Sequence, residues 1–232
     1  MKKISQFVRL VLPLVLCLAF TSLDGLAQTL PFHLPKGAGS FRLGVVCGEE
    51  SRWIDECNIK QEGVHYTIKD NLWKGGKLRL MVCPLPAPAV GFIVKVEGEK
   101  LPQELQLCWA FGGCNGVENP AIADNLIPTA ACRYNVHSTE GNAFTTYYGA
   151  SMRLRTTHGV MPIGSEMRLS DGHQQSSPLA LYHSGKKTDA HVIAALYEWT
   201  EKEACYFCLF QRADYNYFML PEVFEKAYNN AR

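Results

Sequence analysis

Short stretches in which apolar and polar residues alternate follow one another along most of the chain. Alternation with a period of two is typical of β-strands that bury one face. Glycine, proline and asparagine separate the stretches and mark turns. This pattern favours an all-β fold, a large antiparallel β-sandwich, over a parallel α/β sheet. Strands are expected at 40–47, 52–60, 64–69, 77–83, 90–97, 105–111, 132–137, 142–148, 151–157, 165–170, 190–199 and 204–211.

The stretch from 105 to 116 is the clearest of these strands, and it ends at a pair of glycines. Every second residue is large and apolar: Leu105, Leu107, Trp109 and Phe111. Gly112 and Gly113 then permit a sharp turn, because they carry no Cβ. We predict that Trp109 and Phe111 lie in the core. The loop that the glycines release, 114–128, is then the part of this stretch to examine for function.

Two further predictions concern segments between 174 and 211. The segments 190–199 and 204–211 flank a short turn around 201–203 and are expected to form a hairpin, although the first of them also suits a short helix. The polar segment 174–178 is expected to be a loose loop.

The last thirteen residues follow a different period. Their apolar positions fall three and four residues apart, which is typical of one face of an α-helix. An amphipathic linker helix is therefore predicted at 220–232, and a helix of this length needs a surface to pack on. The face consists of Leu220, Val223, Phe224, Ala227, Tyr228 and Ala231.

The beginning of the chain predicts an exported protein. Lys2, Lys3 and Arg9 precede an apolar stretch at 10–20, and small residues precede a cleavage position after Ala27. We interpret 1–27 as a signal peptide, 28–219 as the β-sandwich domain and 220–232 as the linker helix. The expected location is the periplasm, the extracellular space or the cell surface.

Charge gives no reason to expect a polyanionic partner. The formal net charge is +1 for the whole chain. It becomes −1 once the predicted signal peptide, with three basic residues and Asp24, is removed. This balance argues against nucleic acid as a partner and against membrane binding after signal cleavage.

Eight cysteines follow the predicted signal peptide, and several lie in apolar runs. We expect mostly buried thiols, with Cys47–Cys57 or Cys108–Cys114 as possible local disulfides. Cys205 and Cys208 lie three residues apart in a predicted strand, so their sulfur atoms should point to opposite faces. No metal site and no cofactor are predicted, since histidine and cysteine do not cluster at ligand spacing.

The candidate ligand site combines an aromatic residue with a polar loop. Trp73 precedes Gly75 and Gly76 in a predicted turn, and we expect it to be exposed and able to stack on a sugar ring. Asn115, Asn119 and Asp124 follow Gly112 and Gly113, which we call the glycine corner, and they complete the candidate site. If the protein were a glycosidase, Asp124 would need a second carboxylate across the scissile bond.

Several motifs together resemble a known family. The chain resembles the N-terminal domain of large exported Bacteroidetes proteins, a domain catalogued as one of unknown function. The most specific motif is Trp109-Ala-Phe-Gly-Gly113. The others, in order, are Val64-His-Tyr-Thr-Ile-Lys-Asp70, Gly76-Lys-Leu-Arg-Leu80, Gly91-Phe-Ile-Val-Lys-Val-Glu-Gly98, Phe144-Thr-Thr-Tyr-Tyr-Gly149, Gly164-Ser-Glu-Met-Arg-Leu-Ser-Asp171 and Leu220-Pro-Glu-Val-Phe-Glu-Lys-Ala227.

The resemblance implies a large β-sandwich that precedes a six-hairpin helical barrel, the catalytic domain of a glycoside hydrolase. The expected function is therefore that of a non-catalytic N-terminal β-sandwich domain of a carbohydrate-active protein, in a short or truncated form. Its expected partners are a glycan and a helical-barrel catalytic domain. Two alternatives stay open: a stand-alone carbohydrate-binding module, and a glycosidase that uses Asp124 with another acid.

Overall fold

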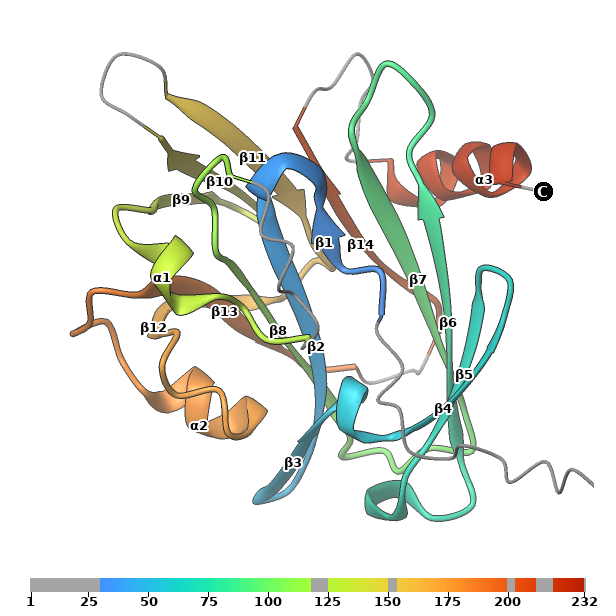
Figure 1. Cartoon of the computed structure of the whole chain (residues 1–232). Helices are drawn as coiled ribbons and strands as arrows, with labels where there is room; N and C mark the ends of the chain where they lie inside the picture. Colours follow the sequence, from blue (N-terminus) through green and yellow to red (C-terminus); the bar gives the residue numbers. More distant parts are fainter. Residues whose placement is uncertain (1–29, 118–124, 150–153, 200–202, 212–218, 232) are drawn as a thin grey trace, which may run out of the picture.

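The computed structural model describes residues 30–117, 125–149, 154–199, 203–211 and 219–231. Two antiparallel sheets pack face to face around the main hydrophobic core (Figure 1), which confirms the predicted all-β sandwich. In spatial order the first sheet contains β1 (His33–Leu34), β2 (Gly39–Cys47), β8 (Gln106–Gly112), β13 (His191–Tyr197) and β12 (Glu166–Asp171), with β3 (Glu50–Trp53) paired to β2. The second contains β4 (Asn58–Glu62), β5 (His65–Lys69), β6 (Lys77–Pro84), β7 (Gly91–Glu99), β14 (Cys205–Phe210), β11 (Arg155–Val160), β10 (Ala143–Tyr148) and β9 (Val136–Glu140).

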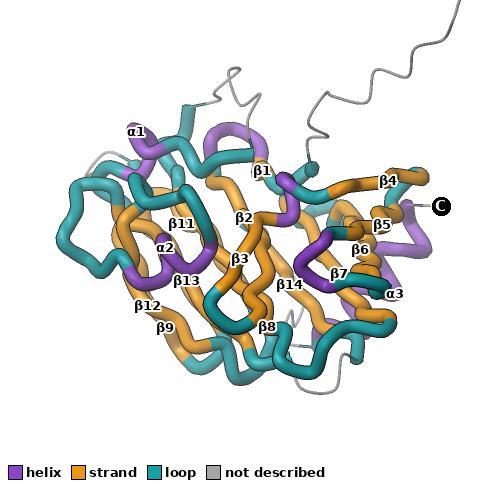
Figure 2. The backbone as a smooth tube through the Cα atoms, turned by 90° about the horizontal axis from the view of Figure 1, so that it is seen from below, coloured by secondary structure: helices purple, strands orange, loops and turns teal. Residues whose placement is uncertain are grey.

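Short helices lie outside the sheets (Figure 2). They are α1 (Thr129–Cys132), α2 (Pro178–His183) and α3 (Leu220–Ala231), with 3-10 turns at Pro35–Gly37, Ile54–Glu56 and Asn71–Trp73. A second apolar cluster lies between α2 and the outer face of the six-stranded sheet, and a third lies between α3 and the outer face of the eight-stranded sheet. The order of layers is therefore helix, sheet, sheet, helix.

Strand β8 shows the predicted alternation. Leu107, Trp109 and Phe111 point into the core between the sheets, whereas Cys108 and Ala110 face the cluster under α2. All five side chains are fully buried. Two buried faces explain why this strand contains so little polar sequence.

The ring of Trp109 links the two sheets. It stacks on Phe144 of β10, with ring centroids 5.7 Å apart, and lies 6.4 Å from Phe41 of β2. Phe111 meets the same Phe144 ring at 5.2 Å. Trp109 and Phe111 are core residues, as the sequence predicted.

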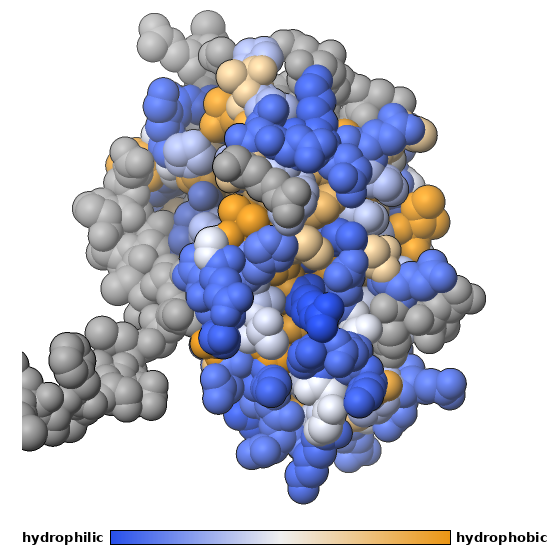
Figure 3. All heavy atoms as spheres, turned by 90° about the vertical axis from the view of Figure 1, so that its right-hand side faces the viewer, coloured by the Kyte–Doolittle hydropathy of each residue, from blue (hydrophilic) through white to orange (hydrophobic). Residues whose placement is uncertain are grey.

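The predicted C-terminal helix is present, and its apolar face is covered. Leu220, Phe224 and Ala227 are buried against β6, β7 and β14. The rest of the surface on this side of the molecule is largely hydrophilic (Figure 3). The surface on which α3 packs is therefore the outer face of the eight-stranded sheet.

The predicted hairpin between 190–199 and 204–211 is wrong. Strand β13 pairs with β12 and β8 in the first sheet, whereas β14 pairs with β7 and β11 in the second. The chain crosses between the sheets at this point. Near the crossing, the indole Nε1 of Trp199 donates to the carbonyl oxygen of Glu203 at 2.7 Å. Both segments are apolar on two faces, so their alternation does not specify a partner strand.

The prediction of a loose loop at 174–178 is wrong, because buried hydrogen bonds hold Gln175 in place. Its side chain is buried, and Oε1 accepts a hydrogen bond from the Ile127 amide at 2.9 Å. Its Nε2 donates to the carbonyl oxygens of Ile127 and Gly172. The side chain of Gln175 thus connects its own loop to the loop that contains Ile127. The buried side-chain amide is stable there because its donor and acceptor groups have hydrogen-bond partners.

The predicted strand at 132–137 begins late. Residues 129–132 form α1, and the Asn135 amide donates to the carbonyl oxygen of Cys132 at 3.0 Å before β9 starts at Val136.

None of the eight cysteines that the structure describes is part of a disulfide, and six of them are buried. The local disulfides considered between Cys47 and Cys57 and between Cys108 and Cys114 are therefore absent from the structure. Cys108 faces the cluster under α2, whereas the Cys114 thiol donates to the carbonyl oxygen of Ala38 at 3.1 Å. Burial raises the pKa of Cys83 to about 11 and that of Cys132 to about 12, so these thiols stay protonated at neutral pH.

Residue His137 of the edge strand β9 contacts β10 in its own sheet and β13 in the other sheet. Its Nδ1 lies 2.8 Å from the Thr146 hydroxyl, and its Nε2 lies 3.3 Å from the carbonyl oxygen of His191. This geometry suits a neutral ring that accepts from Thr146 and donates to His191. Burial lowers the pKa of His137 to about 4 from an ordinary value near 6.5.

We expect His137 to lower the free energy of unfolding as the solution becomes acidic. The unfolded chain binds a proton near pH 6.5, whereas the folded chain resists it until about pH 4. The stability from the neutral ring is therefore complete above pH 6.5 and is lost as the pH falls toward 4. His137→Gln, which does not titrate, should flatten the fall in thermal midpoint between pH 7 and pH 4.5. The exposed control His183→Gln should leave it unchanged. Parallel pH profiles for both variants and the parent would contradict this assignment.

Candidate functional site

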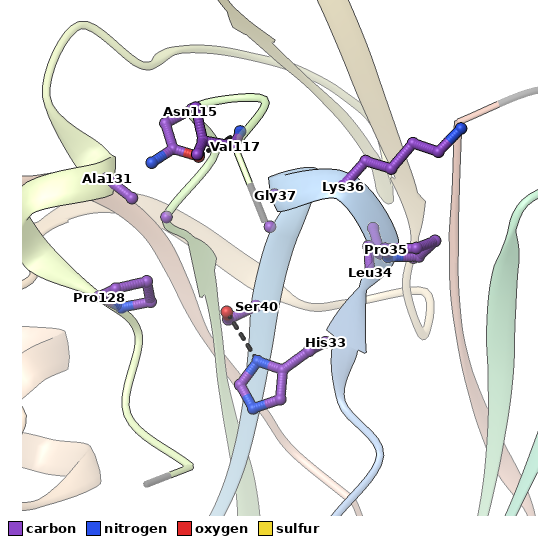
Figure 4. A pocket seen from close by; sticks show the side chains of 12 residues that line it. His33, Leu34, Pro35, Lys36, Gly37, Ser40, Asn115, Val117, Pro128 and Ala131 are labelled. Atoms are coloured by element: carbon purple, nitrogen blue, oxygen red, sulfur yellow. Dashed lines mark hydrogen bonds between the residues drawn. The ribbon is translucent and has the colours of Figure 1, made fainter. Parts of the chain in front are cut away.

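A small cavity lies at the end of the sandwich, where two turns approach each other (Figure 4). Its volume is about 240 Å³. One wall is the turn 34–40, the other is the loop 113–117 that follows the glycine corner, and α1 closes a third side. We call it the corner pocket. Its lining residues are His33, Leu34, Pro35, Lys36, Gly37, Gly39, Ser40, Gly113, Asn115, Val117, Pro128 and Ala131.

The glycine corner shapes one wall of the corner pocket. Gly113 has a φ of 74°, and a Cβ there would come within 2.8 Å of the ring of Pro128. Asn135 then holds the next residue: its Oδ1 accepts from the Cys114 amide at 3.0 Å, and its Nδ2 donates to the Cys114 carbonyl oxygen at 2.6 Å. A side-chain amide thus takes the place of a neighbouring strand, so the loop keeps a fixed shape beyond the end of β8.

The two walls are bonded to each other. The carbonyl oxygen of Gly37 accepts from the amides of Asn115 and Gly116, both at 3.0 Å. Gly37 itself has a φ of 61°, and a Cβ there would overlap the Val117 backbone. Lys36, with a φ of 57°, adopts a left-handed conformation that is uncommon outside glycine. Strained backbone of this kind persists only where surrounding contacts hold it.

Residue His33 contributes the least satisfied polar group of the corner pocket. Its Nδ1 lies 2.8 Å from the Ser40 hydroxyl (Figure 4). Its Nε2 is buried and has no hydrogen-bond partner in the part of the chain that the structure describes. Burial lowers the pKa of His33, so the ring is neutral at pH 7. A buried nitrogen without a partner costs free energy unless a water or a ligand group bonds to it.

Residue Asn115 supplies a donor at the mouth of the corner pocket. Its Oδ1 accepts from the Val117 amide at 2.9 Å, which fixes the side chain. Its Nδ2 makes no hydrogen bond within the described residues and is exposed. The side chain of Lys36 points away from Asn115 and His33 (Figure 4). The groups offered to a ligand are therefore uncharged ones.

The chemistry available here is binding through neutral hydrogen bonds. No aspartate or glutamate is among the residues that line the cavity in the described part of the chain. Across the described residues, no group of three or more histidine, cysteine, aspartate or glutamate side chains is placed to hold a metal ion. Cys205 faces the main core and Cys208 faces the cluster under α3, so the two sulfur atoms diverge as predicted.

The structure agrees with some of the predicted site residues, contradicts another and does not place the rest. Asn115 lines the corner pocket, and Gly112 and Gly113 form the turn that presents it. Asn119 and Asp124 lie outside the described residues, so the structure does not place them. The prediction that Trp73 is exposed was wrong: its relative exposure is 0%, and its ring belongs to the main core. Aromatic rings near turns bury readily when the turn folds back over a sheet, because each removes a large apolar area from water.

Sequence reasoning missed His33 and Ser40. His33 lies in the segment before the first predicted strand, and Ser40 is the first residue of that strand; neither belongs to a recognisable motif in the sequence. The only local signal is the turn chemistry of Pro35 and Gly37. The partner of that turn is the loop at 113–117, nearly eighty residues later, and only the fold brings the two together.

Comparison with known proteins adds one result. Residues 34–228 match the sequence model of a domain of unknown function, DUF4450. No curated protein matches the chain. Among the described residues, no helix is long and apolar enough to cross a membrane.

Proposed function

Because this chain belongs to the DUF4450 family, we propose that it is a non-catalytic β-sandwich domain of an exported carbohydrate-active protein, with the corner pocket as its contact with glycan. A helical-barrel catalytic domain of the glycoside hydrolase type is the proposed partner. The loop 114–128 begins at the corner pocket and is the segment proposed to face that partner. The predicted signal peptide supports the export part of the proposal.

The observation that carries the proposal is a preformed cavity lined by His33, whose buried Nε2 has no hydrogen-bond partner among the described residues. A sugar hydroxyl both donates and accepts hydrogen bonds, so it satisfies an imidazole nitrogen in either tautomer. Asn115 Nδ2 adds a donor at the mouth, and Leu34, Pro35 and Pro128 add apolar surface. A small number of placed polar groups within apolar walls is the usual composition of a ligand site.

The size of the corner pocket also supports a glycan contact. About 240 Å³ lies just below the usual range for whole small-molecule sites, so it suits one sugar unit of a chain, not a large cofactor. Hydrogen bonds from neutral groups contribute about 0.5–1.5 kcal/mol each. The proposed contact is therefore weak by itself, as expected for a domain that assists a catalytic partner.

We expect Asn115→Asp to weaken glycan binding about tenfold, equivalent to about 1.4 kcal/mol. Aspartate keeps the oxygen that accepts from the Val117 amide and replaces the exposed NH₂ donor by a second acceptor. The loop should therefore keep its shape while the donor is lost. Isothermal titration calorimetry of the purified protein with cellohexaose, xylohexaose, mannohexaose and maltohexaose measures the change.

The matched control is Asn230→Asp, on the exposed face of α3 and away from the corner pocket. It should bind as the parent does. Equal weakening by both substitutions points to a general charge effect and contradicts the proposed contact. Hydrolysis of the same sugars that disappears in Asp124→Asn would instead establish the chain as a glycosidase.

A further inference from the structure

Among the described residues, helix α3 covers one part of the outer face of the eight-stranded sheet. Helix α3 lies over β6, β7 and β14. Beside it, the outer faces of β9, β10 and β11 form an open groove of about 500 Å³ that extends to the edge of β14. We call it the sheet groove. Its lining residues are Ser138, Thr139, Glu140, Ala143, Phe144, Thr145, Tyr147, His158, Gly159, Val160 and Phe210.

Strand register places four side chains in one row across the floor of the sheet groove. Thr145 of β10 is paired with Ser138 of β9 on one side and with His158 of β11 on the other. His158 is in turn paired with Phe210 of β14. Neighbouring strands lie about 4.8 Å apart, so the row extends about 14 Å across the sheet. Directly paired residues point to the same face, so all four side chains are presented together.

The histidine in this row is held in one orientation. Its Nδ1 lies 3.0 Å from the Thr145 hydroxyl, and its ring stacks on Phe210 with centroids 5.4 Å apart and planes inclined by 28°. Its Nε2 has no hydrogen-bond partner within the described residues and is not buried. One side of the ring is thus engaged, and the other nitrogen is available to a ligand.

An exposed aromatic ring and a carboxylate lie to either side of the row. Tyr147 is two residues beyond Thr145 on β10, on the same face, and is 39% exposed. Glu140 lies at the opposite end and is exposed. No lysine or arginine is among the described residues that line the groove. The set contains aromatic surface, hydroxyls, one imidazole nitrogen and one acceptor carboxylate, which does not suit an anionic ligand.

We propose that the sheet groove is a second glycan site, which takes a neutral oligosaccharide. One sugar ring packs on Tyr147, and hydroxyls along the oligosaccharide bond to His158 Nε2, Ser138 and Glu140. A pyranose has an apolar C–H face and a rim of hydroxyls, and both are matched here. The groove shares with the proposed function only the class of ligand. It lies on the outer face of the other sheet, and none of its lining residues belongs to the corner pocket.

The test is calorimetric titration of the full chain with the same four hexasaccharides. Tyr147→Ala removes the exposed ring, and Tyr134→Ala is the control because Tyr134 is 80% exposed and lies outside the groove. We expect two binding sites in the parent and in Tyr134→Ala. One site should be lost in Tyr147→Ala, with at least tenfold weaker binding there, while the site sensitive to Asn115→Asp remains.

Other outcomes separate the two proposals. Unchanged stoichiometry and affinity in Tyr147→Ala, with loss in Asn115→Asp, would overturn the sheet groove and leave the corner pocket standing. Loss in Tyr147→Ala alone would support the groove and contradict the corner pocket. Absence of binding to all four sugars by the parent protein would contradict both.

Discussion

Replacing Phe224 by alanine is expected to lower the free energy of unfolding by about 3–5 kcal/mol. The side chain is 2% exposed and fills the space between α3 and the eight-stranded sheet. Its ring lies 5.7 Å from that of Tyr206 and stacks on Tyr228 at 5.6 Å. The ammonium nitrogen of Lys95 lies 5.4 Å from the ring centroid. Alanine would leave a cavity under a short helix that has few other buried side chains.

Urea unfolding followed by circular dichroism measures this loss. The matched control is Asn230→Ala on the exposed face of the same helix, which should change stability by less than about 0.5 kcal/mol. Deleting 220–232 should have a larger effect, because it exposes apolar residues of the sheet such as Ile93 and Cys208. A truncated protein that stays monomeric with parental stability would show that α3 contributes nothing to the fold.

Replacing Arg42 by methionine is expected to cost about 3–5 kcal/mol. This arginine is 3% exposed on the outer face of the six-stranded sheet. Its guanidinium donates to both carboxylate oxygens of Asp55, at 3.0 and 3.3 Å, and to the carbonyl oxygen of Gln175 at 3.1 Å. It also lies 4.2 Å above the ring of Trp53. Methionine fills much of the volume but leaves the acceptors without their donor.

A comparison of ion pairs tests this explanation. Arg52 pairs with Asp70 at 3.5 Å but is 48% exposed, so Arg52→Met should cost less than about 1 kcal/mol. The double replacement Arg42→Met with Asp55→Leu should recover part of the loss, because the mostly buried Asp55 carboxylate is then no longer left unpaired. Glu56, which lies 3.7 Å from Arg42, is 44% exposed and can be solvated by water. Equal costs for Arg42→Met and Arg52→Met in chemical unfolding would be inconsistent with a buried network.

Local alternation predicted the parts of the fold that depend on one strand. The inward face of β8 follows directly from period two in Leu105 to Phe111, and the face of α3 follows from helical spacing at its apolar positions. In both cases the hydrophobic pattern identifies side chains that the fold buries, although in β8 it does not predict that Cys108 and Ala110 on the other face are buried as well. The exposed or buried state of Trp73 depends instead on how the turn Asn71–Trp73 folds back over the core, and the sequence around it gives no such information.

Pairings over long distances in the chain were beyond sequence reasoning. The segments that become β13 and β14 are neighbours in the chain and separate into different sheets, since both strands have two buried faces. The corner pocket likewise depends on contacts between segments that are far apart in the sequence. Asn115 was predicted from the loop after the glycines, but its opposite wall comes from the turn 34–40, and the bonds through Gly37 that join them carry no sequence signature.

The most direct test of the corner pocket is a titration of the ¹⁵N-labelled protein with the hexasaccharide that binds best, followed by NMR. The account predicts saturable shifts of the Asn115 side-chain NH₂ and of the amides of Gly37 and Gly116, together with a change at the imidazole Nε2 of His33. His33, Gly37 and Asn115 line the cavity, and the carbonyl oxygen of Gly37 accepts from the amides of Asn115 and Gly116. A titration in which these signals stay fixed while the sugar binds elsewhere, or does not bind, would contradict the account.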